Sequence, residues 1–209
     1  MLKPIIIAFA LFAISETAFA QKYVFYLHGK IVEDQGPNAS NTAFGKYEYD
    51  NILAKFREAH FTVLSECRKP NTDVKEYAHK VVSQIDSLLK TGVQPGNITV
   101  VGASKGALIA MYVSTYLNNQ HVNFAFLSSC NDYVFTSCAD IAFCGNILSI
   151  FEKSDDGNQS CDKIKTASKR PIPHYKEIEV NTGLHHGYLY KPIPEWMGPA
   201  IKWANGDYK

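Results

Sequence analysis

Several features that mark particular classes of protein are missing from this sequence. Its 209 residues contain no internal repeat and no low-complexity tract, which argues against a solenoid or a disordered chain. Neither sign of charge is in excess, since 21 Lys and Arg stand against 20 Asp and Glu, and no long basic run is present. We therefore expect neither nucleic acid nor an anionic membrane surface to be the main partner. The length is typical of one globular domain.

Long apolar runs are absent after residue 20. Before it, one basic residue precedes an apolar run over residues 5–14 that is too short to span a membrane, and Ala18-Phe19-Ala20 has the small-x-small pattern that signal peptidase accepts. We expect residues 1–20 to be a cleaved export signal and residues 21–209 to be a soluble periplasmic or secreted domain. A membrane anchor or a buried N-terminal helix is the alternative.

Paired C-x-x-C spacings are also absent, which argues against a zinc site. Export would place the cysteines in an oxidising compartment, so we expect one or two disulfides between residues 130 and 161, with the connectivity open. Buried thiols are the alternative, because Cys67 and Cys130 lie at the ends of predicted strands. The five cysteines are Cys67, Cys130, Cys138, Cys144 and Cys161.

What the sequence does contain is an alternation of two hydrophobic periods. Because neighbouring parallel strands need crossover connections, this alternation predicts an α/β fold: a mostly parallel twisted sheet with helices on both faces. Ligands bind such sheets at the carboxyl ends of the strands. Strands are predicted at residues 23–27, 61–64, 97–101, 124–127, 147–151 and 175–180, and helices at 47–59, 73–90, 107–117 and 194–205.

The most specific motif is Gly102-Ala103-Ser104-Lys105-Gly106, between a predicted strand and a predicted helix. A serine on such a sharp turn projects its hydroxyl from the top of the sheet, and the flanking glycines remove Cβ atoms that would collide there. Ser104 is therefore the candidate nucleophile. A Gly-Ser turn that only caps the helix is the alternative. The backbone N–H groups of Lys105 and of Lys30, which follows the first strand, are the candidate oxyanion donors.

A serine hydroxyl needs a base, and histidine suits this role because its pKa lies near neutrality. His185 and His186 both follow the last predicted strand, and we choose His186, which directly precedes a glycine. Asp155 and Asp156 follow the preceding strand, and we choose Asp155 as the acid that orients the histidine. His28 is expected to stabilise its loop. The predicted reaction uses no metal and no cofactor.

With these residues in the order serine, acid, histidine, the sequence resembles the α/β-hydrolase superfamily, and more narrowly its small exported bacterial members. The resemblance implies acyl transfer through an acyl-enzyme, with the triad Ser104, Asp155 and His186. Only 19 residues separate the strands predicted at 124–127 and 147–151, too few for the helical cap domain that many members carry. The expected fold is thus a minimal α/β-hydrolase with an open cleft.

The expected function is a serine hydrolase that cleaves a carboxylic ester of a small molecule. We expect Tyr188 and Tyr190 to border the cleft, and the side chains of Lys30 and Lys105 nearby to favour an acyl group with a polar or anionic portion. A peptidase, thioesterase or acyltransferase would use the same triad. A hydrolase-fold protein that binds a ligand without catalysis is the alternative from another class.

Overall fold

The structure is a computed structural model that describes residues 20–209. The predicted export signal, apart from its last residue, lies outside this range. Within the range, no helix combines the length and the apolar character that crossing a membrane requires.

All six predicted strands are present in one sheet. The strands are β1 (Tyr23–Leu27), β4 (Thr62–Leu64), β5 (Ile98–Ala103), β6 (Asn123–Leu127), β7 (Asn146–Glu152) and β8 (Tyr175–Val180). A separate two-stranded hairpin is formed by β2 (Ser40–Asn41) and β3 (Gly45–Lys46). The helices are α1 (Lys30–Gln35), α2 (Tyr49–Glu58), α3 (Val74–Lys90), α4 (Lys105–Leu117), α5 (Asp132–Ser137), α6 (Asp162–Ala167) and α7 (Pro194–Ala204), with two 3₁₀ turns, η1 (Pro95–Asn97) and η2 (His185–Tyr190).

The main sheet is parallel throughout, in the order β4-β1-β5-β6-β7-β8. This confirms the predicted fold class. Register brings the carboxyl ends of the central strands together, because Leu27 of β1 pairs with Gly102 of β5 and Ala103 pairs with Leu127 of β6. The loops that follow these strands therefore meet at one edge, where the predicted site residues lie.

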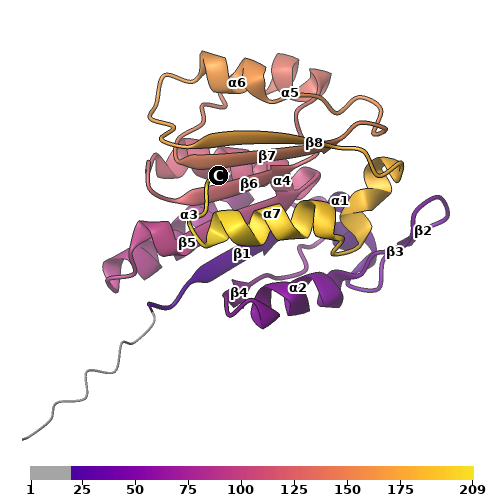
Figure 1. Cartoon of the computed structure of the whole chain (residues 1–209), viewed down its shortest axis with the longest axis horizontal. Coiled ribbons are helices and arrows are strands. Elements are labelled where there is room, and N and C mark those ends of the chain that lie inside the picture. Colours follow the sequence, from indigo (N-terminus) through magenta and orange to yellow (C-terminus); the bar gives the residue numbers. More distant parts are fainter. Residues whose placement is uncertain (1–19) are drawn as a thin grey trace, which may run out of the picture.

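Helices cover both faces of the sheet, as predicted. On one face α2 and α7 pack together, with the ring of Phe56 against that of Trp196. On the other face α3 and α4 pack on the sheet, and α5 and α6 extend the same hydrophobic core. Figure 1 shows α7 in front of the sheet and the pair α5 and α6 beyond β8. Lys163 of α6 lies over the ring of Phe135 of α5, which joins this pair.

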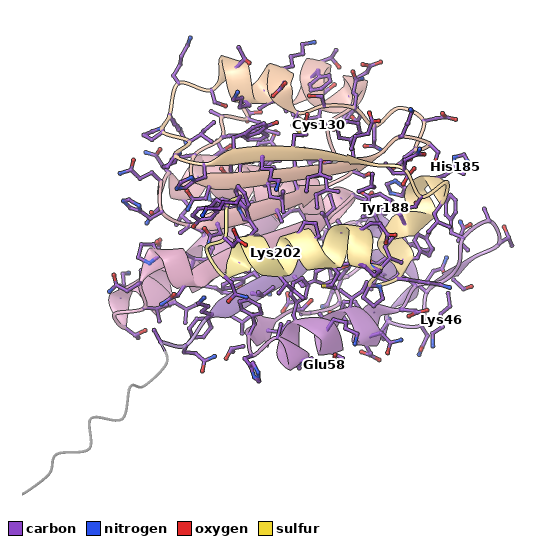
Figure 2. The ribbon with its side chains drawn as sticks, in the orientation of Figure 1. Lys46, Glu58, Cys130, His185, Tyr188 and Lys202 are labelled. Carbon is purple, nitrogen blue, oxygen red and sulfur yellow. A yellow bond between two sulfur atoms is a disulfide. The ribbon has the colours of Figure 1, made fainter. Side chains whose placement is uncertain are left out.

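The connection between β6 and β7 carries only α5, a helix of six residues. The absence of a cap domain at this position agrees with the short spacing in the sequence. One disulfide, between Cys130 and Cys161, ties the exit of β6 to the start of α6. Cys130 lies beneath α5 and α6 (Figure 2). The other three cysteines are thiols, exposed at Cys67 and buried at Cys138 and Cys144.

Candidate active site

Ser104 occupies the sharp turn that the motif predicts. It is the single residue between β5 and α4, and its backbone has φ 53° and ψ −120°. A non-glycine residue at positive φ is strained, and such strain persists only where the surroundings enforce it. Here the Ser104 N–H donates to the carbonyl of Leu127 at 2.9 Å, and the Ser104 carbonyl accepts from Ala107 at 2.8 Å. The turn thus holds the partly exposed serine at the top of the sheet.

The two motif glycines are required because a side chain at either position would collide with the backbone. A Cβ on Gly102 would lie 2.3 Å from the carbonyl oxygen of Gly106, and a Cβ on Gly106 would lie 1.9 Å from that of Leu27. Both distances are far below any that real Cβ atoms show. The absence of these side chains allows α4 to pack directly against β5 and the end of β1.

Lys30 and Lys105 begin α1 and α4, so their N–H groups have no acceptor within their own helices. The pairing of β1 with β5 brings the loop that carries Lys30 beside the serine turn. Gly29, the residue before Lys30, is not sterically required: a Cβ there would lie 3.7 Å from the Cβ of Ser104, an ordinary contact. The close approach of the two loops is therefore set by strand register.

His186 and Asp155 are brought together by the ends of β8 and β7. The Nδ1 atom of His186 lies 2.7 Å from Oδ2 of Asp155, which is buried. Since a carboxylate only accepts hydrogen bonds, Nδ1 carries the proton and Nε2 is left as the free acceptor. The two alternatives lie elsewhere: Asp156 is exposed, and exposed His185 bonds through Nδ1 to the carbonyl of Ser154. Figure 2 shows His185 at the edge of the molecule where β8 ends.

Sequence reasoning missed a second group that holds Asp155. The side-chain amide of Asn158 donates to Oδ2 of Asp155 at 2.9 Å, and its backbone N–H donates to the Asp155 carbonyl at 3.1 Å. Nothing in the sequence singles out this asparagine, because the contact depends on the tight turn after β7. Asp155 Oδ2 thereby receives two donors from its surroundings. Glu152, at the end of β7, was also missed, and its carboxylate accepts hydrogen bonds from the hydroxyls of Ser154 and Thr182.

Ser104 and His186 line the same cavity of about 150 Å³. Within residues 20–209 the hydroxyl of Ser104 makes no hydrogen bond, so none joins it to the imidazole of His186 in this structure. Contacts of this kind often form only when substrate is bound. The remaining wall of the cavity is formed by Gly29, Lys30, Ile31, Tyr47, Ala103, Leu189 and Tyr190.

One predicted cleft residue is wrong. Tyr188 is fully buried, and its hydroxyl bonds to the hydroxyl of Ser128 at 2.9 Å and to the carbonyl of Ile150 at 3.1 Å. It therefore anchors η2 to the sheet. Tyr190, also predicted to border the cleft, does line the cavity.

The lysine side chains do not supply the positive charge expected at the cleft. The ammonium of Lys30 pairs with Asp34 at 2.6 Å on the surface. The ammonium of Lys105 pairs with buried Glu33 at 2.5 Å and donates to the carbonyl of Thr72 at 2.7 Å. Because both ammonium groups are held by carboxylates of the protein, neither is placed to bind an anionic acyl group, and the structure gives no support for the expected preference for one. The sequence could not show this, since Glu33 lies 72 residues before Lys105.

His28 is a structural histidine, in agreement with the expectation. It is fully buried, and burial together with the nearby Arg68 charge lowers the pKa of His28 to about 4. Its neutral ring bonds through Nδ1 to the carbonyl of Gly29 at 2.9 Å, and Nε2 accepts from the Arg68 N–H at 3.0 Å. Both ring nitrogens are thus occupied in holding the loop that precedes Lys30.

Comparison with known proteins shows that the chain resembles several solved structures in fold. No protein-family model and no curated protein sequence matches the chain. SOBER1 from Arabidopsis thaliana superposes with a TM-score of 0.59 and 14% identity, over 91% of this chain and all of that one. The Pyrococcus furiosus esterase Pf2001 superposes with a TM-score of 0.61 and 12% identity, over 90% of this chain and 83% of that one. ATU1826 from Agrobacterium tumefaciens, a candidate α/β hydrolase of unknown function, superposes with a TM-score of 0.58 and 16% identity. The match covers 90% of this chain and 88% of that one.

Proposed function

We propose that this chain, which has the α/β-hydrolase fold, is a serine hydrolase that cleaves a carboxylic ester or a related acyl bond. The observation that carries the proposal is the 2.7 Å bond between His186 and Asp155, beside a cavity shared by His186 and Ser104. A nucleophile on a strained turn, a base and an acid that orients the base form the complete set that acyl transfer requires.

In the proposed mechanism, the Ser104 hydroxyl attacks the carbonyl carbon of the ester while Nε2 of His186 takes its proton. Asp155 holds the Nδ1–H and stabilises the imidazolium. The N–H groups of Lys30 and Lys105 bind the oxyanion. The alcohol leaves with the proton from His186, and water, activated in the same way, then releases the acid and restores Ser104.

The substrate class follows from the cavity. Besides Ser104 and His186, the cavity is lined mainly by apolar and aromatic residues, among them Ile31, Leu189, Tyr47 and Tyr190, together with Lys30, and its volume is about 150 Å³. A small, mainly apolar site of this kind suits a short acyl group better than a long lipid chain. We therefore favour esters of short acyl groups with small-molecule alcohols.

Labelling with a fluorophosphonate probe tests the proposal, because the reaction requires an activated serine. The wild-type protein should be labelled, and the Ser104→Ala and His186→Ala variants should not. A folded wild-type protein that stays unlabelled would instead support a hydrolase-fold protein that binds without catalysis. A panel of p-nitrophenyl esters, thioesters and peptides then separates an esterase from a thioesterase or a peptidase, and an added alcohol that captures the acyl group in place of water identifies an acyltransferase.

We also propose that residues 1–20 direct export of the hydrolase domain at residues 21–209. The Cys130–Cys161 disulfide supports this, because such bonds persist in oxidising compartments. The test is the N-terminal residue of the protein recovered from cells: Gln21 in a non-cytoplasmic fraction supports export, and an intact Met1 in the cytoplasm contradicts it.

A further inference from the structure

Glu152 is a buried carboxylate between the two loops that carry Asp155 and His186. It is the last residue of β7, paired in the sheet with Val180, the last residue of β8, and it is fully buried. A buried carboxylate is costly unless hydrogen bonds compensate its charge. The partners of Glu152 therefore show what its charge is used for.

Every partner of the carboxylate belongs to one of the two loops. Oε1 accepts from the N–H of Ser154 at 3.2 Å and from its hydroxyl at 2.8 Å. Oε2 accepts from the N–H of Thr182 at 2.9 Å and from its hydroxyl at 2.6 Å. Gly183 adds its N–H to Oε1 at 3.4 Å. One side chain thus joins the loop after β7 to the loop after β8.

The two hydroxyls extend these contacts towards His186. The Thr182 hydroxyl oxygen accepts from the N–H of Leu184 at 3.2 Å, and the Ser154 hydroxyl oxygen accepts from the N–H of His185 at 3.1 Å. The backbone N–H groups of the four consecutive residues 182–185 are therefore hydrogen-bonded to Glu152, either directly or through one intervening hydroxyl. The residue that follows them is His186.

Glu152 is also connected to the acid. Its backbone carbonyl accepts from the N–H of Asp155 at 3.0 Å. The positions of Asp155 and of the backbone before His186 are thus both defined relative to one residue. Their separation fixes the 2.7 Å bond between the imidazole and the carboxylate.

Glu152 is charged at neutral pH, as the acceptance of these hydrogen bonds requires. Burial by itself raises the pKa of Glu152, but the hydrogen bonds from Thr182 and Ser154 outweigh it and lower the pKa to about 2. The group is therefore ionised at neutral pH and can accept all five hydrogen bonds, because a carboxylate has only acceptor sites. A glutamine would turn an NH₂ group towards donors in one of the two loops.

We propose that Glu152 is a positioning residue that sets the geometry of the Asp155–His186 pair. The inference rests on the proposed function for its consequence in catalysis. Groups that act on a catalytic residue through hydrogen bonds commonly change activity by about 10–100-fold when they are replaced. They do so without contacting substrate, so they change the chemical step more than binding.

The test compares Glu152→Gln with Glu179→Gln, which makes the same substitution at an exposed position of β8. With a p-nitrophenyl acetate substrate, Glu152→Gln should lower kcat about 10–100-fold and leave KM within about twofold, whereas Glu179→Gln should behave as wild type. An equal kcat in the two variants would overturn the proposal. A revertant that restores the glutamate, prepared by the same route as the variant, should recover the wild-type kcat if the loss is caused by this side chain.

A second measurement does not depend on catalysis. The Nδ1 proton of His186, held by Asp155, should give a downfield, slowly exchanging proton NMR signal in wild type and in Glu179→Gln, and lose it in Glu152→Gln. If wild type neither hydrolyses esters nor reacts with the probe, the proposed function fails, while this signal still decides the role of Glu152. A signal that persists unchanged in Glu152→Gln would overturn that role.

Two milder variants cover the case in which Glu152→Gln does not fold. Thr182→Val and Ser154→Ala each remove one hydroxyl from the network and leave the carboxylate in place. Each should lower kcat several-fold and speed amide exchange at Leu184 or His185 respectively. Wild-type kcat and exchange in both variants would contradict the proposal.

Discussion

The ammonium of Lys105 lies 2.5 Å from Glu33, which joins the residue after the serine to helix α1. Glu33 also accepts from Arg68 at 3.1 Å, and the hydrogen bonds from both cations hold its pKa below the usual value although burial opposes this. Because α1 begins at Lys30, the ion pair connects the two helices whose first N–H groups are the proposed oxyanion donors. We therefore expect the ion pair to help hold these two donors in place, in addition to the strand register.

Replacing Lys105 with Met tests this connection. The backbone N–H remains, but Glu33 keeps only part of its compensation, so we expect the free energy of unfolding to fall by about 2 kcal/mol. A displaced oxyanion donor should also lower kcat about tenfold, less than the loss for a removed donor. Urea denaturation and steady-state kinetics measure the two effects.

Lys30→Met is the matched control, because it makes the same substitution at the other proposed donor. The side chain of Lys30 is more than half exposed, and its ammonium pairs with Asp34 at the surface. Such pairs contribute little, so stability should change by less than about 0.5 kcal/mol. Equal effects of the two substitutions would contradict the assigned role of the Lys105–Glu33 pair.

Gly106→Ala should prevent correct folding of the serine turn. The new Cβ would lie 1.9 Å from the carbonyl oxygen of Leu27, which is backbone and cannot move aside without breaking the packing of α4 on β1. We expect a loss of more than about 3 kcal/mol, or an insoluble protein. Gly29→Ala is the control in the same region, since its Cβ meets only ordinary contacts at 3.7 Å. Thermal melting of the two variants distinguishes them.

The parts of this protein that sequence predicted correctly depend on local patterns. Each strand of the sheet was visible as a β-rich run, and α3 as apolar positions spaced three and four apart, with Asp73 capping its first turn. The serine turn was recognisable because the glycines two residues before and two residues after Ser104 are both needed to avoid a steric collision at the turn. The positions of the cysteines placed the disulfide between residues 130 and 161 but did not show which two cysteines form it.

What the sequence could not predict depends on contacts between distant residues. The role of Glu152 requires the ends of β7 and β8 to be adjacent, and the Lys105–Glu33 pair requires α1 to lie beside α4. Tyr188 was misplaced because no local sequence pattern distinguishes a tyrosine in a cleft from a buried one when it lies near a candidate catalytic histidine. The helices α1, α5 and α6 were missed because six residues are too few to show a helical period.

The stability of the protein should fall in mildly acidic solution because of His28. Its pKa is lowered from 6.5 to about 4, so the unfolded chain binds a proton more readily than the folded one between these values. The stabilising contribution is complete above pH 6.5 and is lost as the pH falls towards 4. From pH 7 to pH 5 this amounts to about 2 kcal/mol. Urea denaturation at the two pH values measures it.

His28→Gln separates this contribution from that of other groups. Glutamine retains one of the two hydrogen bonds but does not titrate, so the variant should be less stable than wild type at pH 7. Its unfolding free energy should change less than that of wild type between pH 7 and pH 5. An identical pH dependence in the two proteins would show that His28 is not the responsible group.

The Cys130–Cys161 disulfide should stabilise the fold through the unfolded state. It closes a loop with a sequence separation of 31, for which the chain-entropy estimate is about 4 kcal/mol. The loop contains β7 and Asp155, and the Gln159 N–H donates to the Cys130 carbonyl at 2.8 Å close to the bond. We expect the double variant Cys130→Ala, Cys161→Ala to melt well below wild type.

Reduction of the wild-type protein provides the control, because it breaks the same bond without changing a side-chain skeleton. The reduced protein and the double variant should melt at similar temperatures, and a reductant should have no further effect on the variant. The other cysteines, Cys67, Cys138 and Cys144, are thiols in the structure, so the reductant has no second disulfide to break. A wild-type melting temperature that a strong reductant leaves unchanged would mean that the bond contributes nothing to stability, and the loop-entropy argument would then fail for this fold.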